Sequence, residues 1–497
     1  MSNGISIIMT GNKKYKLIRS RIVLPFSEKM GLSTRIQDGY ILTEGKLIKS
    51  VGEYNDSIGE KLVTKYGKEL QIIGQKEGCS DIPCIDGVVM PGFIKAHGHN
   101  HEPALIGIAK DEPLIDWLDH AVNPFTGFLN EDKEYIEKEL GVTGSYATFI
   151  KAFLDDIHYG ITSAMNHQCN FAKYLVADMV KAGLEAGTKL IIAVGGQDRN
   201  YDKRILDTPE VAVERLNKYK AEFGDLENIT IIPGPDQVFS NSDTIIKALK
   251  NWAEENNTLF HMHSSEEPNT TAWFIEQYGC TPVEYLNNAG ILDNTVILAH
   301  QVNTTANDMK ILKETGTNIV HNPLANTILG SGMPPVVEMI NSGIPVAIST
   351  DGSGSADNQN ILSAARLASQ YQKAYLKDAK VMKAQDVLER ITIGPAKMLR
   401  LNAGSLEKGK DADLVLIDLS KNNMVPTRID NVMETLVWCT DGSEVRWVIA
   451  NGKILKDDYK IQHLDVEKIN KDIFKLSEMM MEYKKTYQTT LETGARD

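Results

Sequence analysis

The sequence lacks three features that would place it in a specialised class of protein. Its five cysteines, Cys79, Cys84, Cys169, Cys280 and Cys439, are odd in number and form no C-x-x-C pair, so neither a disulfide framework nor a zinc knuckle is indicated. No segment reaches the roughly 18 apolar residues of a membrane helix. Basic residues are outnumbered, 53 against 66 acidic ones, and the net charge of −13 disfavours nucleic acid and anionic lipid as partners. We therefore expect a cytoplasmic protein.

The remaining composition is that of an ordinary globular protein. The chain has 497 residues, of which 42% are hydrophobic and 24% charged, which predicts two or three domains and excludes a disordered chain. Short strand-like runs occur near both ends, whereas strand-like and helical stretches alternate between them. We predict a β domain built from residues 1–88 and 403–460, a barrel over 89–402, and a helical extension over 461–497.

The middle of the chain contains a series of apolar runs that predict parallel strands. Eight such strands are typical of a (β/α)₈ TIM barrel, whose catalytic residues lie at the C-terminal ends of its strands. The expected fold class is therefore α/β, a TIM barrel with a small β-sandwich domain. The predicted strands are Val88–Lys95, Gly160–Asn166, Leu190–Gly195, Ile229–Pro233, Thr258–Met262, Thr295–Ala299, Asn318–His321 and Pro345–Thr350.

Histidines follow the first and fifth predicted strands in pairs. The first strand leads into His97-Gly-His99 and the fifth ends in His261-Met-His263-Ser-Ser-Glu266. Residues two apart on a strand point to the same face, so His97 and His99 can both aim at one metal ion. We assign His263 to the same ion and expect His261 one layer deeper in the barrel, with His261 as the alternative ligand.

The sixth and eighth predicted strands add one histidine and one carboxylate. His300 ends the sixth strand and Asp351 the eighth. Zinc and iron(II) accept imidazole and carboxylate together, and a catalytic site leaves one position open for water. We therefore predict one divalent metal ion, with zinc preferred and iron as the alternative. The predicted ligands are His97, His99, His263 and Asp351, and the predicted catalytic residues are Glu266, His300 and Asp351.

Five segments carry a family resemblance: PGFIKAHGH, HSSE, LAHQV, HNPLANTILGSGMPPVVEMINSGIPVAISTDGSGS and GSLEKGKDADLVLID. They are similar to those of the amidohydrolase superfamily, in the branch of the S-adenosylhomocysteine, guanine and cytosine deaminases and the triazine hydrolases. The resemblance implies hydrolytic deamination, in which the metal lowers the pKa of water from 15.7 toward about 7. It also implies that Glu266 shuttles protons, while His300 and Asp351 orient the attacking hydroxide and polarise the substrate.

Two positions depart from members of that superfamily. Binuclear members bridge two metals with a modified lysine at the end of strand 4, where this chain has Asp236-Gln237, so the resemblance implies a mononuclear site. Cytosine deaminases follow the metal-binding Asp with a second Asp, where this chain has Gly352, which disfavours cytosine as the substrate.

The segment HGHNHEPALIGIAKDEPLIDWLDHAVNPFTGF is similar to enzymes that act on small cyclic guanidines or amidines, creatinine deaminase among them. We therefore predict deamination of creatinine to N-methylhydantoin and ammonia. The alternatives are a guanine-, cytosine- or pterin-type deaminase, a triazine-type chlorohydrolase or amidase, and a non-catalytic binding barrel. The branch also implies a homo-oligomer.

Substrate contacts are expected from the remaining strand ends, because those side chains surround the predicted metal. The candidates are His101, Trp117, His120, His167, Gln197, Asp198, Arg199, Asp236, Gln237 and His321, with Glu102 and Asn322 at the same ends.

Overall fold

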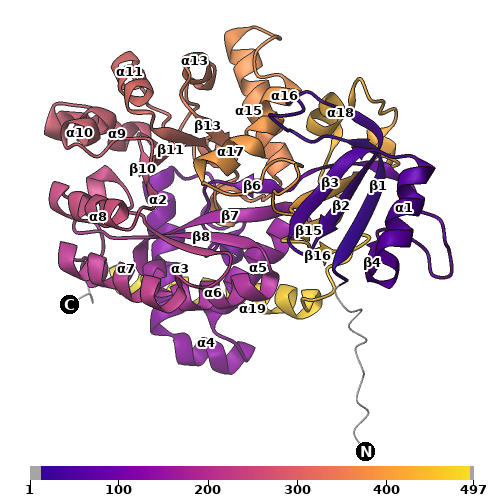
Figure 1. Cartoon of the computed structure of the whole chain (residues 1–497). Helices are drawn as coiled ribbons and strands as arrows, with labels where there is room; N and C mark the ends of the chain where they lie inside the picture. The colour runs from indigo at the N-terminus through magenta and orange to yellow at the C-terminus, as the bar shows by residue number, and fades with distance from the viewer. Residues whose placement is uncertain (1–12, 493–497) are drawn as a thin grey trace, which may run out of the picture.

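The computed structural model describes residues 13–492. An eight-stranded mixed sheet brings the two flanks of the chain together, in the order β16-β15-β14-β5-β1-β2-β3 with β4 paired to β1. In Figure 1 its indigo and yellow strands lie side by side. β1 runs parallel to β5 and antiparallel to β2. The strands are β1 (Tyr15–Val23), β2 (Ile36–Glu44), β3 (Leu47–Glu53), β4 (Leu70–Ile72), β5 (Ile85–Pro91), β14 (Leu414–Asp418), β15 (Val445–Ala450) and β16 (Lys453–Lys456).

This sheet has a hydrophobic core of its own. Ile18, Ile41, Val89, Leu416 and Trp447 are buried together and come from strands of both chain flanks. Because the described strands form one hydrogen-bonded sheet, the predicted two-sheet sandwich is not confirmed. The division of the chain at residues 88, 402 and 460 stays a prediction.

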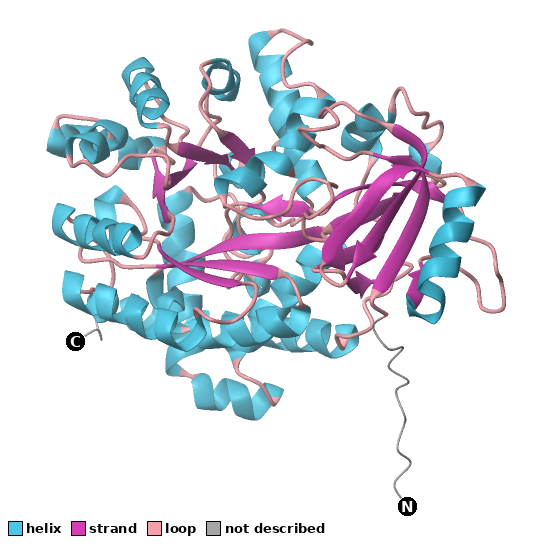
Figure 2. Ribbon diagram, in the orientation of Figure 1, coloured by secondary structure: helices cyan, strands magenta, loops and turns pink. Residues whose placement is uncertain are grey.

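The eight predicted barrel strands form two parallel four-stranded sheets. These strands are buried except at Thr230, and they are rich in apolar residues, as in other parallel sheets. Figure 2 shows the helices on the outside of these strands. One sheet contains β6 (Phe93–Lys95), β7 (Ile161–Gln168), β8 (Lys189–Val194) and β9 (Ile229–Pro233), and the other contains β10 (Phe260–Ser264), β11 (Val296–His300), β12 (Asn318–His321) and β13 (Val346–Ile348).

Single hydrogen bonds join the two sheets where no ladder does. The N–H of His263 donates to the C=O of Asp236 (2.9 Å) beyond β9. At the other seam the Ser349 hydroxyl donates to the C=O of His97 (2.6 Å). Lower in that seam, the N–H groups of Ile94 and Ile348 donate to carbonyls of the segment 390–391 (3.0 Å each). The α/β-barrel arrangement is therefore present in the described residues, without a continuous closed ladder.

The first predicted strand is divided at Gly92. The chain leaves the mixed sheet after Pro91 and enters the barrel at Phe93. A Cβ at Gly92 would lie 2.4 Å from the Thr162 side chain, so only glycine allows this close passage. The prediction of one strand over Val88–Lys95 was therefore wrong, because apolar composition alone does not show where a chain changes sheets.

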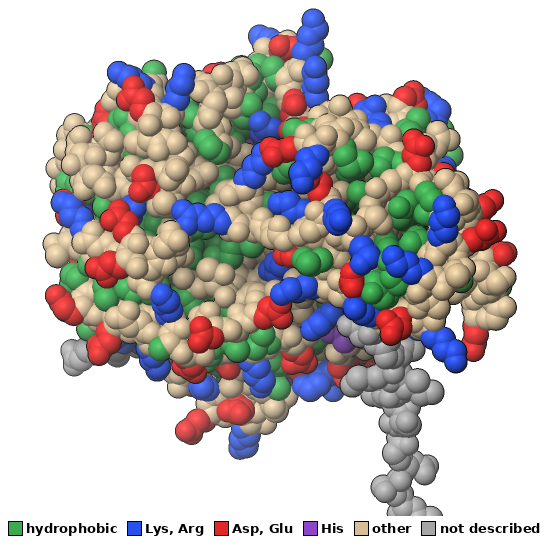
Figure 3. All heavy atoms as spheres, viewed as in Figure 1, with side chains coloured by type: hydrophobic (Ala, Val, Ile, Leu, Met, Phe, Trp, Pro, Cys, Tyr) green, Lys and Arg blue, Asp and Glu red, His purple; other side chains and the backbone are tan. Residues whose placement is uncertain are grey.

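Helices cover the barrel and complete the described chain. Among the helices of residues 13–492, none combines the length and apolar character of a transmembrane span. Acidic and basic side chains are interspersed on the face in Figure 3. The main helices are α1 (Asp56–Tyr66), α2 (Leu114–Trp117), α3 (Asn123–Glu131), α4 (Lys133–Leu140), α5 (Gly144–His158), α6 (Val176–Ala186), α7 (Pro209–Phe223), α8 (Asp243–Glu255), α9 (Pro268–Tyr278), α10 (Pro282–Asn288), α11 (Ala306–Thr315), α12 (Pro323–Ile328), α13 (Val336–Asn341), α14 (Ser353–Ala356), α15 (Ile361–Leu376), α16 (Ala384–Glu389), α17 (Ile393–Met398), α18 (Val432–Cys439) and α19 (Val466–Glu492).

Candidate active site

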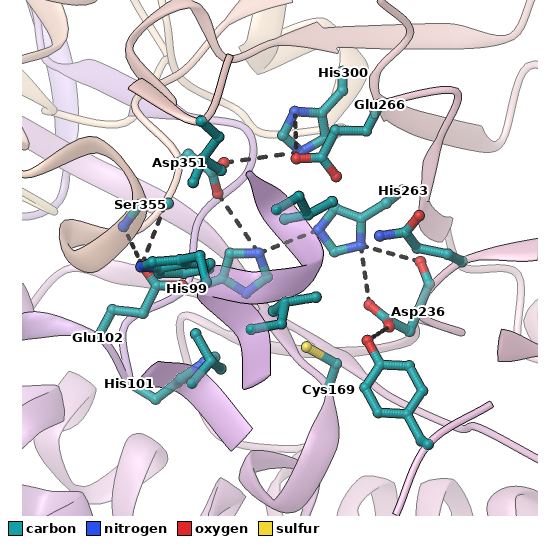
Figure 4. A pocket seen from close by; sticks show the side chains of 17 residues that line it. His99, His101, Glu102, Cys169, Asp236, His263, Glu266, His300, Asp351 and Ser355 are labelled. Atoms are coloured by element: carbon teal, nitrogen blue, oxygen red, sulfur yellow. Dashed lines mark hydrogen bonds and ion pairs between the residues drawn. The ribbon is translucent and has the colours of Figure 1, made fainter. Parts of the chain in front are cut away.

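The residues predicted to carry the chemistry lie together at the C-terminal ends of the barrel strands (Figure 4). His97 and His99 follow β6, His263 lies in β10, His300 ends β11 and Asp351 follows β13. Glu266 lies two residues beyond β10. No residue of this set exceeds 8% exposure. We call His97, His99, His263, Glu266, His300 and Asp351 the strand-end cluster.

Two members of the strand-end cluster have strained backbones. His300 has φ of +75° and Asp351 has φ of +68°, the left-handed region that non-glycine residues rarely adopt. Such strain persists where the surrounding structure imposes it, commonly at functional sites.

Three of the histidine rings are held through Nδ1. His99 Nδ1 lies 3.0 Å from the carbonyl oxygen of His167. His263 Nδ1 lies 3.0 Å from the carbonyl oxygen of Asp236 and 3.2 Å from its carboxylate. His97 Nδ1 lies 3.2 Å from His261 Nε2. Each contact leaves Nε2 free to face the centre, as ligating histidines require.

The two Nε2 atoms of His99 and His263 face each other at 3.2 Å. Because a carbonyl oxygen can only accept, Nδ1 carries the proton in both neutral rings, so both Nε2 atoms present lone pairs. Two lone pairs at this distance repel each other unless a proton or a metal ion lies between them. Burial alone would lower the pKa of His263, but its contact with Asp236 raises the pKa to about 9.

A tetrahedral metal ion fits the same place. Zinc–nitrogen bonds of 2.0–2.1 Å separate two ligating nitrogens by about 3.3 Å, close to the distance between the two rings. His97 Nε2 is buried and makes no hydrogen bond within the described part of the chain, and it lies 3.2 Å from Asp351 Oδ1. One ligand atom each of His97, His99 and Asp351 lies within 4.8 Å of the others, and the same holds for His97, His263 and His300.

Glu266 and His300 lie beside this group. His300 Nδ1 is 3.6 Å from Glu266 Oε1 and 2.8 Å from the Asn326 side-chain oxygen, while His300 Nε2 is 3.8 Å from Asp351 Oδ2. Burial raises the pKa of Glu266. A carboxyl group with a raised pKa is suited to take up and return a proton.

His261 lies in a deeper layer, where it supports the rings above. Its Nε2 contacts His97 and its Nδ1 lies 2.9 Å from His167 Nδ1. His261 is fully buried, and both of its ring nitrogens are engaged in these contacts. The structure therefore favours His263 over His261 as the residue that faces the centre.

A small cavity opens beside the strand-end cluster (Figure 4). Its volume is about 30 Å³, far below the range of roughly 300–1,000 Å³ typical of pockets for drug-sized ligands. Leu114, Trp117, Leu118, Val122 and Leu329 form its apolar wall. Helix α2 and the following π-helical turn (Leu118–Val122) supply the first four of these residues.

Glu102 presents a carboxylate to this cavity. One oxygen accepts hydrogen bonds from the N–H groups of Gly354 (2.9 Å) and Ser355 (3.0 Å) and from the Ser355 hydroxyl (3.2 Å). Among the described residues no donor reaches the other oxygen. A Cβ at Gly352 would lie 1.9 Å from the bonded oxygen, so Glu102 occupies the space of a side chain at position 352. Burial, followed by the charge of Asp351, raises the pKa of Glu102 to about 8.

The predicted substrate-binding residues divide into two groups. His101, Trp117, Asp236 and Gln237 line the cavity. Within residues 13–492 both ring nitrogens of His101 are buried without a hydrogen-bond partner, and burial lowers the pKa of His101 to about 4. Asp236 also holds His263, and the Tyr201 hydroxyl donates to it (2.6 Å).

The other predicted substrate contacts are not brought to the cavity. Asp198 accepts from the N–H of Ser242 (2.8 Å). Arg199 donates to the carbonyl of Asn241 (2.6 Å), and Gln197 accepts from Lys173 (3.2 Å). Half-exposed His120 pairs with Glu112 (2.7 Å). His167 and His321 are buried outside the cavity lining, and Asn322 lies 3.4 Å from His300 Nε2.

Four further residues of the site were not singled out by the sequence. Tyr201 and Cys169 line the cavity, and Ser355 and Asn326 hold Glu102 and His300. Their position shortly after barrel strands is the one signal that could have found them, since their residue types are common elsewhere.

Comparison with known proteins shows the family of the chain. Residues 88–455 match the Amidohydrolase family. The chain is 30% identical over 433 residues to a 5-methylthioadenosine/S-adenosylhomocysteine deaminase of Aquifex aeolicus, covering 85% of this chain and 94% of that protein. It is 32% identical over 432 residues to a 5'-deoxyadenosine deaminase of Methanococcus maripaludis, covering 86% and 93%.

A solved structure shows the same fold. The zinc-bound adenosine deaminase of Xanthomonas campestris superposes with a TM-score of 0.81 at 22% identity, covering 94% of this chain and 98% of that one. The family match spans well over half of the chain. The chain therefore belongs to the amidohydrolase family, and its relatives place it in the deaminase branch.

Proposed function

We propose that this amidohydrolase is a metal-dependent deaminase, which replaces the amino group on an amidine carbon of a nitrogen heterocycle with oxygen and releases ammonia. The observation that carries the proposal is the pair of Nε2 atoms of His99 and His263, which lie 3.2 Å apart and are buried with Asp351. The deaminases among the relatives support the reaction.

The ligands we propose are His97, His99, His263 and Asp351, around one divalent ion. Zinc fits the imidazole and carboxylate donors, and the zinc in the Xanthomonas structure supports that choice. When bound, the ion supplies a Lewis acid that lowers the pKa of water. Iron is the alternative metal.

Glu266 moves the protons in the proposed reaction. It takes one proton from the attacking water and delivers it to the ring nitrogen beside the reacting carbon. Glu266 then takes the remaining proton from the hydroxyl on the tetrahedral carbon and passes it to the amino group, so that the C–N bond breaks, ammonia departs and the carbon–oxygen double bond forms. His300 lies between Glu266 and Asp351 and orients the attacking oxygen.

The proposed substrates carry an amino group on an amidine carbon, as the adenine ring of the relatives' named substrates does. His101 and Glu102 would hold the ring, because each offers the cavity a polar atom without a partner among the described residues. The relatives do not support creatinine, and they favour neither the guanine, cytosine and pterin alternatives nor a chlorohydrolase, an amidase or a non-catalytic barrel. The cytoplasmic location and the homo-oligomer stay predictions.

Ammonia release by the zinc-loaded protein tests the proposal, across 5'-deoxyadenosine, 5-methylthioadenosine, adenosine, guanine, cytosine and creatinine. We expect ammonia to appear in step with substrate loss. Glu266→Gln should keep its zinc but lose about 10²- to 10⁴-fold in turnover. Glu267→Gln is the matched control, because Glu267 caps helix α9 through the N–H groups of Asn269 and Thr270. Near-wild-type turnover in Glu266→Gln, or no ammonia from any compound, would contradict the proposal.

A further inference from the structure

Cys169 has a different environment from the other cysteines. It directly follows β7 and is 5% exposed, whereas Cys79, Cys84 and Cys439 are exposed. Figure 4 shows its sulfur on the side of the cavity that Asp236 lines. Burial, followed by the nearby charge of Asp236, raises the pKa of the thiol well above its usual value.

His167 completes a group around this thiol. Its Nδ1 contacts His261, whereas its Nε2 is buried without a hydrogen-bond partner among the described residues. That Nε2 lies 3.9 Å from Asp236 Oδ1. One ligand atom each of His167, Cys169 and Asp236 lies within 4.8 Å of the other two.

No hydrogen bond within the described residues explains why His167 Nε2 is buried. A buried polar atom without a partner destabilises the folded chain, and native structures rarely keep one without a reason. An imidazole, a thiol and a carboxylate together are a donor set for zinc or another thiophilic divalent ion. We propose that His167, Cys169 and Asp236 form a second metal site, separate from the strand-end cluster.

Asp236 connects the two sites. Its carboxylate contacts His263 Nδ1, on the opposite edge of the ring from the Nε2 that faces the strand-end cluster. When an ion binds in the second site, the thiol of Cys169 loses its proton to solvent. The ion then bonds to the sulfur, to His167 Nε2 and to one oxygen of Asp236. No other covalent bond changes.

Occupation of the second site inhibits the proposed deaminase. Cys169 and Asp236 both line the cavity of about 30 Å³, so an ion between them takes space that a substrate needs. It also draws Asp236 away from His263. The first equivalent of metal therefore activates the proposed deaminase, and the second equivalent inhibits it.

Cadmium titration of the zinc-loaded full chain tests this site directly. One variant keeps Cys169 and replaces Cys79, Cys84, Cys280 and Cys439 by serine, and the matched variant replaces Cys169 as well. We expect the Cys169-only protein to bind one cadmium ion per chain, with a thiolate-to-cadmium charge-transfer band in the ultraviolet and its zinc retained. The cysteine-free protein should show no band. Equal cadmium binding by the two proteins, or no band in either, would overturn the proposal.

A second variant separates metal ligation from a reactive thiol. His167→Gln in the Cys169-only protein leaves the sulfur in place and removes one ligand. We expect cadmium to bind at least about 10-fold more weakly, since even outer partners of metal ligands contribute 10- to 100-fold, while the zinc content stays the same. Unchanged cadmium affinity would show that His167 is not a ligand. These readouts do not depend on turnover, so they stand or fall separately from the deaminase proposal.

Discussion

Two groups of buried polar side chains in this molecule differ in whether their polar atoms have partners. At the C-terminal ends of the barrel strands, ring nitrogens of His97 and His101 have no hydrogen-bond partner among the described residues. At the start of β8, Lys189 pairs with Asp413 and with Asp411 (2.9 Å), and Asp413 also accepts from the N–H of Asn451 (2.7 Å). We call this second group the sheet–barrel ion pair, because it ties a barrel strand to the loop before β14.

The difference indicates what each group is for. A buried charge with a full set of partners stabilises one arrangement of the chain. Buried polar atoms that point to one place and have no partners indicate a ligand-binding site. Mutations in the strand-end cluster should therefore affect metal content and turnover, and mutations in the sheet–barrel ion pair should affect stability.

The largest expected effect is that of Asp351→Asn. The substitution keeps the shape of the side chain but removes the negative charge that would balance the metal. We expect zinc loss in dialysis against a chelator and a fall in turnover of about 10³-fold or more, because the pKa of water is then no longer lowered. Zinc analysis and an ammonia assay measure the two. Retained zinc with normal turnover would remove Asp351 from the ligand set.

Lys189→Met should lower stability and leave zinc content and turnover unchanged. Removing one partner of a buried pair leaves Asp413, which is 1% exposed, without its main compensating charge. We expect a loss of about 3–5 kcal/mol in the free energy of unfolding, measured by denaturant titration. Zinc content and kcat should match the wild type well below the unfolding transition. A loss of zinc without a loss of stability would contradict the structural role of the sheet–barrel ion pair.

Glu102→Gln should change how stability depends on pH. The pKa of Glu102 is raised from 4.5 to about 8 in the folded protein, so the folded state holds its proton more tightly than the unfolded state. This contribution is complete below pH 4.5 and is lost as the pH rises through 8. Glutamine cannot ionise, so in metal-free protein the variant should gain about 3 kcal/mol relative to wild type between pH 5 and pH 8. Parallel stability curves would show that Glu102 does not carry the shifted pKa.

The sequence predicted the strands and their ends because both follow from local patterns. Apolar runs marked all eight barrel strands, and a histidine or carboxylate at a strand end must lie near the others once the barrel forms. The prediction failed at Gly92, where the chain moves from β5 to β6, because a change of sheet depends on a contact with Thr162 that is distant in sequence.

Side-chain direction explains the remaining gap between the sequence and the site. Arg199 and Glu102 both follow barrel strands, yet Arg199 holds the segment 238–241 while Glu102 lines the cavity. Position after a strand fixes the end of the barrel but not the partner that each side chain finds. The role of Glu102 depends on Gly352 and Ser355, some 250 residues away, and no local pattern indicates that contact.

The central claim is that the strand-end cluster binds a metal ion and that the protein needs this ion to deaminate a heterocycle. Its most direct test compares zinc-loaded and metal-stripped protein in one ammonia-release assay with 5'-deoxyadenosine, followed by return of one equivalent of zinc. We predict ammonia in step with loss of the amino compound, no release after stripping, and recovery with the single equivalent. Equal release with and without metal, or substrate loss without ammonia, would contradict it.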